Sequence, residues 1–195
     1  MGVFPDADYP GRELLGVGSP AEVMTRILEG DPLEIRARCR ERLEEEALLL
    51  SLHRLHLRAL ARTAHGAPRY RGSPPLDAWL RTCIDQSIAD LLEEDRDEER
   101  SFALSDGELE HPYAYIADLL QCEPELARSA CVAFNALPRD DRRTFFAVVI
   151  ERTPLIRFVA QGNGPPTKVK DALRRAFRAL GLADESWGSS EESDS

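Results

Sequence analysis

Apolar residues recur at helical spacing along most of this 195-residue chain. Between residues 32 and 63 the leucines Leu48, Leu52 and Leu55 follow one another at intervals of four and three, and a similar pattern runs from Leu76 to Asp95. This spacing is typical of amphipathic α-helices, and no segment alternates apolar and polar residues as a half-buried strand does. The sequence therefore predicts an all-α fold.

Helix starts are marked by capping signals. "SPAE" from Ser19 and "DPLE" from Asp31 each place a capping side chain first, proline at the first helical position and glutamate at the third. We expect helices to begin at residues 20 and 32, the second continuing to about residue 63. Thr153 and Pro154 predict another start of the same kind.

The remaining patterns divide the chain into two helical domains. Further helices are predicted after Pro112, over Glu123–Ala136, after Pro138, from Thr153 to "QGNGPP", and over 167–180. The predicted organisation is a disordered N-terminus (1–18), a first helical domain (19–95), an acidic linker with a short helix (96–122), a second helical domain (123–182) and a disordered acidic tail (183–195).

Charge is unevenly distributed within a net charge of −10. Between Asp85 and Glu125 fourteen acidic residues face two arginines, whereas Arg139 to Leu182 holds ten basic and four acidic residues. A net acidic protein ordinarily repels nucleic acid, but a local basic region keeps that binding open. The second domain is therefore the candidate for DNA contact.

Other function classes find little support in the composition. No apolar run is long enough to cross a bilayer, no secretory signal opens the chain, and Cys39, Cys83, Cys122 and Cys131 form no CxxC pair, so we expect a cytoplasmic protein with reduced thiols. No phosphate-loop, dinucleotide, nucleophile-elbow or zinc-protease motif occurs. His53 and His56 lack convergent ligands. We expect no enzyme activity, no cofactor, no metal site and no catalytic residue.

The segment "TKVKDALRRAFRAL" places five positive charges on one predicted helix. A short helix and a glycine-containing turn precede it, which is the order of a helix-turn-helix. The predicted DNA-binding residues are Lys168, Lys170, Arg174, Arg175 and Arg178. Periodicity alone fits a solvated helix face as well, and such faces are the more common occurrence.

A family resemblance strengthens the DNA hypothesis. "NALPRDDRRTFFAVVIERTP" followed by "VKDALRRAFRAL" resembles region 4 of bacterial sigma-70 factors of the extracytoplasmic-function type. Leu137, Pro138 and Arg142 or Arg143 match its L-P-x-x-x-R pattern. The recognition-helix pattern is matched by Val169, Lys170, Leu173, Arg175, Ala176 and Leu180. In that family this helix binds the −35 promoter element.

The first domain resembles sigma region 2 of the same family. "RGSPPLDAWLRTCIDQSIADLL" is similar to the end of that region, and the matching residues are Ala78, Trp79, Leu80, Arg81, Asp90 and Leu92. The two resemblances occur in the family's order, over roughly residues 35–95 and 123–182. Together they imply two helical bundles, a promoter-like DNA partner and the RNA polymerase core.

Departures from the family bear on function. Between Ala64 and Arg69, where the family has a helix that docks on polymerase, only "HGAP" occurs. Asp85 and Gln86 replace an Arg-Asn pair that faces the −10 strand, and carboxylates there repel phosphate. The turn before the recognition helix is one residue shorter than usual, and Arg157 lies near a position usually held by glutamate.

Two hypotheses remain open from the sequence. The first is a divergent sigma-like transcription regulator that binds double-stranded DNA through its C-terminal helix-turn-helix. The alternative is a protein-interaction module that mimics a sigma factor and binds an anti-sigma factor or RNA polymerase without promoter activity, since acidic surfaces suit basic protein partners.

Overall fold

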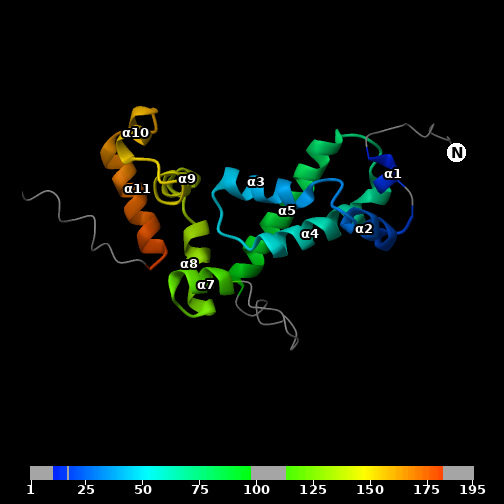
Figure 1. Cartoon of the computed structure of the whole chain (residues 1–195), viewed down its shortest axis with the longest axis horizontal. Helices are drawn as coiled ribbons and strands as arrows, with labels where there is room; N and C mark the ends of the chain where they lie inside the picture. The colour runs from blue at the N-terminus through cyan, green and yellow to red at the C-terminus, as the bar shows by residue number, and fades with distance from the viewer. Residues whose placement is uncertain (1–10, 17, 98–112, 182–195) are drawn as a thin grey trace, which may run out of the picture. The chain divides into compact units, whose positions relative to one another are not determined.

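The computed structural model describes residues 11–16, 18–97 and 113–181, and within these ranges the chain forms helices and no strand (Figure 1). The helices are α1 (Arg12–Leu15), α2 (Pro20–Leu28), α3 (Ile35–Glu46), α4 (Leu52–Gly66), η1 (Ala67–Arg69), α5 (Leu76–Arg96), α7 (Ala114–Leu120), α8 (Pro124–Asn135), α9 (Arg139–Phe145), η2 (Phe146–Ile150), α10 (Leu155–Ala160) and α11 (Pro166–Ala179). The predicted all-α fold is confirmed.

The chain divides into two compact units that are interleaved in sequence. The first unit holds Met1–Arg42 and Leu50–Ser101, and the second holds Leu43–Leu49 and Phe102–Ser195. Residues 43–49, which we call the strap, comprise the last turn of α3 and the residues after it. The strap therefore belongs by its contacts to the C-terminal part of the chain.

The predicted domain boundaries need correction at the N-terminus as well, and three of the predicted segments lie wholly or partly outside the described residues. Part of the predicted disordered N-terminus forms α1, because Leu15 is apolar and becomes buried, with 1% of its surface exposed. Residues 1–10 and 17 of the predicted N-terminus, residues 98–112 of the predicted linker and the whole predicted tail (183–195) lie outside the described residues. The short helix expected after Pro112 is α7.

The first unit begins its second helix as the sequence predicts. Ser19 Oγ accepts a hydrogen bond from the Glu22 backbone N–H (3.4 Å), and Glu22 Oε2 accepts one from the Ser19 backbone N–H (2.7 Å). This reciprocal capping box satisfies two N–H groups that the helix leaves without partners. The core is formed by buried apolar residues of several helices: Leu15, Val23, Ile27, Ile35, Cys39, Leu55, Leu60, Leu80, Ile84 and Leu91.

The prediction of one helix over residues 32–63 is wrong at its start. The helix begins at Ile35, because residues 31–34 form a turn in which Asp31 and Glu34 have positive φ angles of 46° and 52°. Asp31 still caps it, since its two carboxylate oxygens accept from the backbone N–H groups of Ile35 (2.8 Å) and Arg36 (2.9 Å). A negative group at this end is favoured by the helix dipole.

The predicted long helix is also divided into α3 and α4. At the end of α3 the Leu48 N–H donates to Leu43 O (3.0 Å) and the Ala47 N–H to Glu44 O (3.1 Å), with Ala47 at a φ of 50°. This is the Schellman arrangement that ends many helices, here with alanine in the left-handed position usually taken by glycine. A new helix then starts at Leu52, and Ser51 Oγ accepts from the Arg54 N–H.

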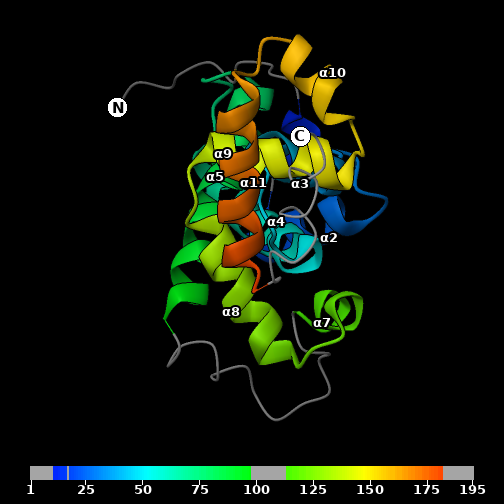
Figure 2. The same ribbon diagram turned by 90° about the vertical axis from the view of Figure 1, so that its left-hand side faces the viewer.

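The second unit packs α8, α9, α10 and α11 around one apolar cluster (Figure 2). Its buried members are Phe134, Phe145, Phe158, Val169, Leu173, Ala176 and Leu180. Helix α9 continues directly into a π-helical turn, η2, where the Glu151 N–H donates to Phe146 O at 2.9 Å. The expected cap at Thr153 is wrong: Pro154 is the N-cap of α10, which has no side-chain cap.

Candidate nucleic-acid interface

Helices α10 and α11 follow one another across a short turn, which is the order that the predicted helix-turn-helix requires. Phe158 of α10 lies in one cluster with Val169 and Leu173 of α11, so the two helices share a core. The turn between them needs glycine twice, because Gly162 and Gly164 have φ angles of 86° and 101°. Asn163 Nδ2 in this turn donates to Phe158 O (3.0 Å) and fixes the turn to the end of α10.

The faces of α11 separate apolar from basic residues. Val169, Ala172, Leu173 and Ala176 are buried. Of the predicted DNA-binding residues, Lys168, Arg174, Arg175 and Arg178 are exposed and Lys170 is half-buried. Lys170 lies at the edge of the face, where it lines a small hollow with Leu173, Arg174 and Phe177. The predicted stripe of residues 170, 174 and 178 is therefore not uniformly exposed.

Arg175 is engaged within the protein. Its Nε and Nη2 donate to the two carboxylate oxygens of Asp141 on α9, at 2.6 and 2.8 Å. These hydrogen bonds raise the pKa of Arg175, and the Asp141 side chain is only 7% exposed. Such a two-pronged arginine–carboxylate pair is among the stronger polar contacts. This geometry supports a role for Arg175 in orienting α11 on α9.

An acidic residue interrupts the basic face. Asp171 is exposed between Lys168 and Arg174, and its Oδ1 accepts from Arg174 Nη1 at 3.1 Å. Exposed ion pairs of this i, i+3 kind contribute little to stability. Arg174 therefore remains able to exchange Asp171 for another anion such as a phosphate.

Besides Arg139, whose Nε lies 3.1 Å from Glu46 Oε2, three further exposed arginines lie on the described part of the second unit outside α11. They are Arg143 on α9, Arg152 after η2 and Arg157 on α10. In the sequence they contribute to the net positive charge of this region, but no DNA contact was predicted for them. Their exposure became evident only from the packing of α9 and α10.

A cleft of about 520 Å³ opens beside the start of α11. It is lined by residues of α9, η2, the α10–α11 turn, the first turns of α11 and the strap. Among its charged lining residues Arg143 and Lys168 are basic, while Glu44, Asp140, Asp141 and Glu151 are acidic. The cleft therefore brings both signs of charge to the end of α11 that, in a helix-turn-helix, approaches base edges.

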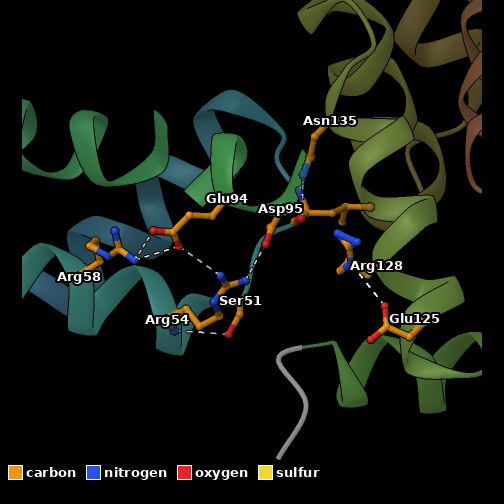
Figure 3. Close-up of polar contacts among 9 residues, drawn as sticks. Ser51, Arg54, Arg58, Glu94, Asp95, Glu125, Arg128 and Asn135 are labelled. Carbon is orange, nitrogen blue, oxygen red and sulfur yellow. Dashed lines mark hydrogen bonds and ion pairs between the residues drawn. The ribbon is translucent and has the colours of Figure 1, made fainter. Parts of the chain in front are cut away.

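In the first unit, the acidic side chains of α5 are paired with arginines. Arg58 Nη2 donates to Glu94 at 2.6 Å and Arg54 Nη1 donates to Asp95 at 2.8 Å, as Figure 3 shows. Asp90 pairs with Arg62, and Asp85 pairs with Arg42 of α3 at 2.6 Å. These carboxylates neutralise cations of their own unit, and those arginines are correspondingly occupied.

The predicted gap in the first unit is visible in the structure. Between α4 and α5, where every residue is described, the only helix is the three-residue η1. Trp79 of α5 stacks on Tyr70 just after η1, with ring centroids 4.5 Å apart. This stacking closes the α4–α5 connection tightly.

No group of three histidine, cysteine or acidic residues suited to a metal ion occurs among the described residues. None of the helices that the structure describes has the length and apolarity needed to cross a membrane. His56 is mostly buried, with its Nε2 3.9 Å from Asp31 Oδ2.

No family model, curated protein or solved structure matches the chain. The sigma-factor resemblance therefore remains a prediction from the motifs. The interface has to be interpreted from its own geometry and charge.

Proposed function

We propose that this protein is a divergent, sigma-factor-like transcription regulator that binds double-stranded DNA through α10 and α11. The observation that carries the proposal is the exposed basic face of α11, with Lys168, Arg174 and Arg178, on the second helix of a helix-turn-helix. Such a regulator acts where the chromosome is, which in a bacterial cell is the cytoplasm.

The physical argument rests on phosphate neutralisation. Phosphate contacts from lysine and arginine supply most of the affinity of such proteins, and a helix presented to the major groove supplies sequence preference. Lys168 lies in the first turn of α11, while Arg174 and Arg178 lie one turn apart further along it. Arg175 supports the same function indirectly, because its pair with Asp141 orients α11.

A salt titration of DNA binding tests the proposal. We expect the full chain to bind a labelled mixed-sequence duplex at low salt, with affinity that falls steeply as salt rises. The double variant Arg174→Ala/Arg178→Ala should bind more weakly and reduce the slope of log K against log salt by about 2, since each lost phosphate contact removes about 0.9. Fluorescence anisotropy measures both quantities.

The matched control is Arg40→Ala/Arg69→Ala, which removes the same charge from exposed positions of the first unit. It should leave the slope unchanged. Equal losses in the two double variants would show that only net charge matters, and the absence of binding by the wild-type chain at low salt would overturn the proposal.

A second candidate function is the protein-interaction module. It is favoured by the first unit, where only η1 links α4 to α5 and where Arg54, Arg58 and Arg62 are paired with carboxylates of α5. A pull-down from nuclease-treated bacterial lysate distinguishes the candidates. Recovery of the polymerase β and β′ subunits supports a working link to transcription, whereas enrichment of one different protein supports the mimic.

A further inference from the structure

The strap is held on the second unit by side chains that bind its backbone. Arg142 donates to the carbonyl oxygens of Glu46 (Nη2, 3.0 Å) and Ala47 (Nε, 3.1 Å). Asn135 binds Leu49 on both sides, because its Oδ1 accepts from the Leu49 N–H and its Nδ2 donates to the Leu49 oxygen, each at 2.9 Å. Because these contacts are made to backbone atoms of the strap, they do not depend on which side chains the strap carries.

Acidic side chains are therefore not required for most of this attachment. Among the strap's three glutamates, Glu46 forms an ion pair, since its Oε2 lies 3.1 Å from Arg139 Nε. The Glu44 side chain is exposed and has no hydrogen bond or ion pair within the described ranges of the chain. It also lies in the last turn of α3, where the helix dipole disfavours a negative charge. Helix stability does not explain this residue.

The position of Glu44 suggests another role. Glu44 lines the same cleft as Arg143 and Lys168, the two basic residues of that lining. Because the Debye length is about 10 Å at 0.1 M salt, charges that line one cleft are only partly screened from one another. A carboxylate there lowers the positive potential that an approaching phosphate meets.

We propose that the strap is autoinhibitory: Glu44, fixed in the cleft by the backbone contacts of the strap, opposes DNA phosphate at Arg143 and Lys168. This inference rests on the proposed DNA-binding function and adds its regulation. Neutralisation of Glu44 then increases DNA affinity. The contacts of Arg142 and Asn135 attach the strap, whereas the carboxylate of Glu44 supplies the inhibitory charge.

The variant Glu44→Gln tests the charge without disturbing this attachment, because Arg142 and Asn135 bind backbone atoms. In the full chain it should bind a mixed-sequence duplex about two- to fivefold more tightly than wild type at low salt, the range expected for one exposed charge pair. Glu44→Lys should increase affinity further. Both gains should fade as salt screens the cleft.

The matched control is Asp118→Asn, which removes one exposed acid from the last turn of α7 in the same unit. Figures 1 and 2 draw α7 and α10 at opposite ends of this unit. Wild-type affinity in Asp118→Asn with a gain in Glu44→Gln supports the inference. Equal affinity of wild type and Glu44→Gln would overturn the inhibitory role of the strap but not the proposed DNA binding. The absence of DNA binding by all of these proteins would overturn both proposals.

Discussion

Arg142 is the residue on which the second unit depends most clearly. Its side chain is buried, with 9% of the residue exposed, and it donates to four carbonyl oxygens. Two of these belong to the strap and two, on Asn135 and Leu137, lie at the end of α8 and just after it. Burial lowers the pKa of Arg142, but carbonyls at two helix ends supply compensating partial negative charge.

Replacement of Arg142 by alanine should therefore destabilise the protein by about 2–4 kcal/mol, because it leaves buried carbonyls without donors. Arg143→Ala, one residue further along but exposed, should change the free energy of unfolding by less than about 0.5 kcal/mol. Urea unfolding followed by circular dichroism measures both. Similar losses in the two variants would contradict the role assigned to Arg142.

His56 gives the first unit a pH-dependent stability. Burial lowers its pKa below 6.5 despite the attraction of Asp31, and Arg36 and His53 act in the same direction as burial. The unfolded chain therefore takes up a proton below pH 6.5 that the folded chain does not bind until the pH is lower. The contribution of neutral His56 to the free energy of unfolding is therefore present above pH 6.5 and is lost as the pH falls toward the lowered pKa.

The replacement His56→Gln removes this titration. We expect the free energy of unfolding of wild type to fall more steeply than that of the variant between about pH 7.5 and pH 5.5. Parallel curves would indicate that carboxylates, not His56, determine stability in this range. Denaturant titrations at several pH values provide the comparison.

At single positions, the sequence predicted which side chains are exposed better than it predicted which side chains form ion pairs. The helical pattern correctly placed Lys168, Arg174 and Arg178 on an exposed face. It could not predict that Arg175 binds Asp141, because the two residues are 34 positions apart and meet only after α9 and α11 pack. Residue spacing reports the face of a helix, whereas an ion pair requires the neighbouring helix.

At the level of elements, helices were predictable where their ends carry a chemical signal. The starts of α2 and α5, and the extent of α8 and α11, agree with the predictions to within a few residues. The break between α3 and α4 was missed because Ala47 occupies a left-handed position without glycine or proline to announce it. The buried strap contacts compensate for the strain of that conformation.

The pairing of α4 with α5 was hidden for a related reason. The acidic run at the end of α5 carries no sign of burial in the sequence, yet Glu94 is half-buried and Asp95 is buried with 3% of its surface exposed. Arg54, Arg58 and Arg62 recur every four residues on α4 and so lie on one face. They meet their carboxylate partners on α5 only because α4 and α5 pack together. The residue pattern of a single helix does not specify that packing.

At the scale of the whole molecule, the two units are interleaved rather than consecutive. The sequence predicted a boundary in the acidic segment after residue 95, but the strap lies far upstream of it and belongs to the second unit. A fragment that starts at Phe102 therefore lacks part of its own fold. Arg142 and Asn135 would lose strap acceptors, and the core would lose Leu49, which packs against its apolar clusters.

The isolated fragment Phe102–Ser195 should accordingly be less stable than the same unit in the full chain. The lost hydrogen bonds and apolar contact amount to roughly 3 kcal/mol, which corresponds to a decrease in Tm of more than about 10 °C for a domain of this size. A synthetic peptide of residues 41–51 added in trans should raise the Tm, since Asn135 and Arg142 bind its backbone.

The control peptide carries Leu49→Asp, which preserves the backbone acceptors but places a charge against the apolar clusters. It should rescue the fragment poorly. If the fragment alone unfolds at the temperature of the full chain, the strap is not part of its fold. If both peptides rescue equally, the backbone hydrogen bonds of Asn135 and Arg142 carry the attachment and burial of Leu49 adds little.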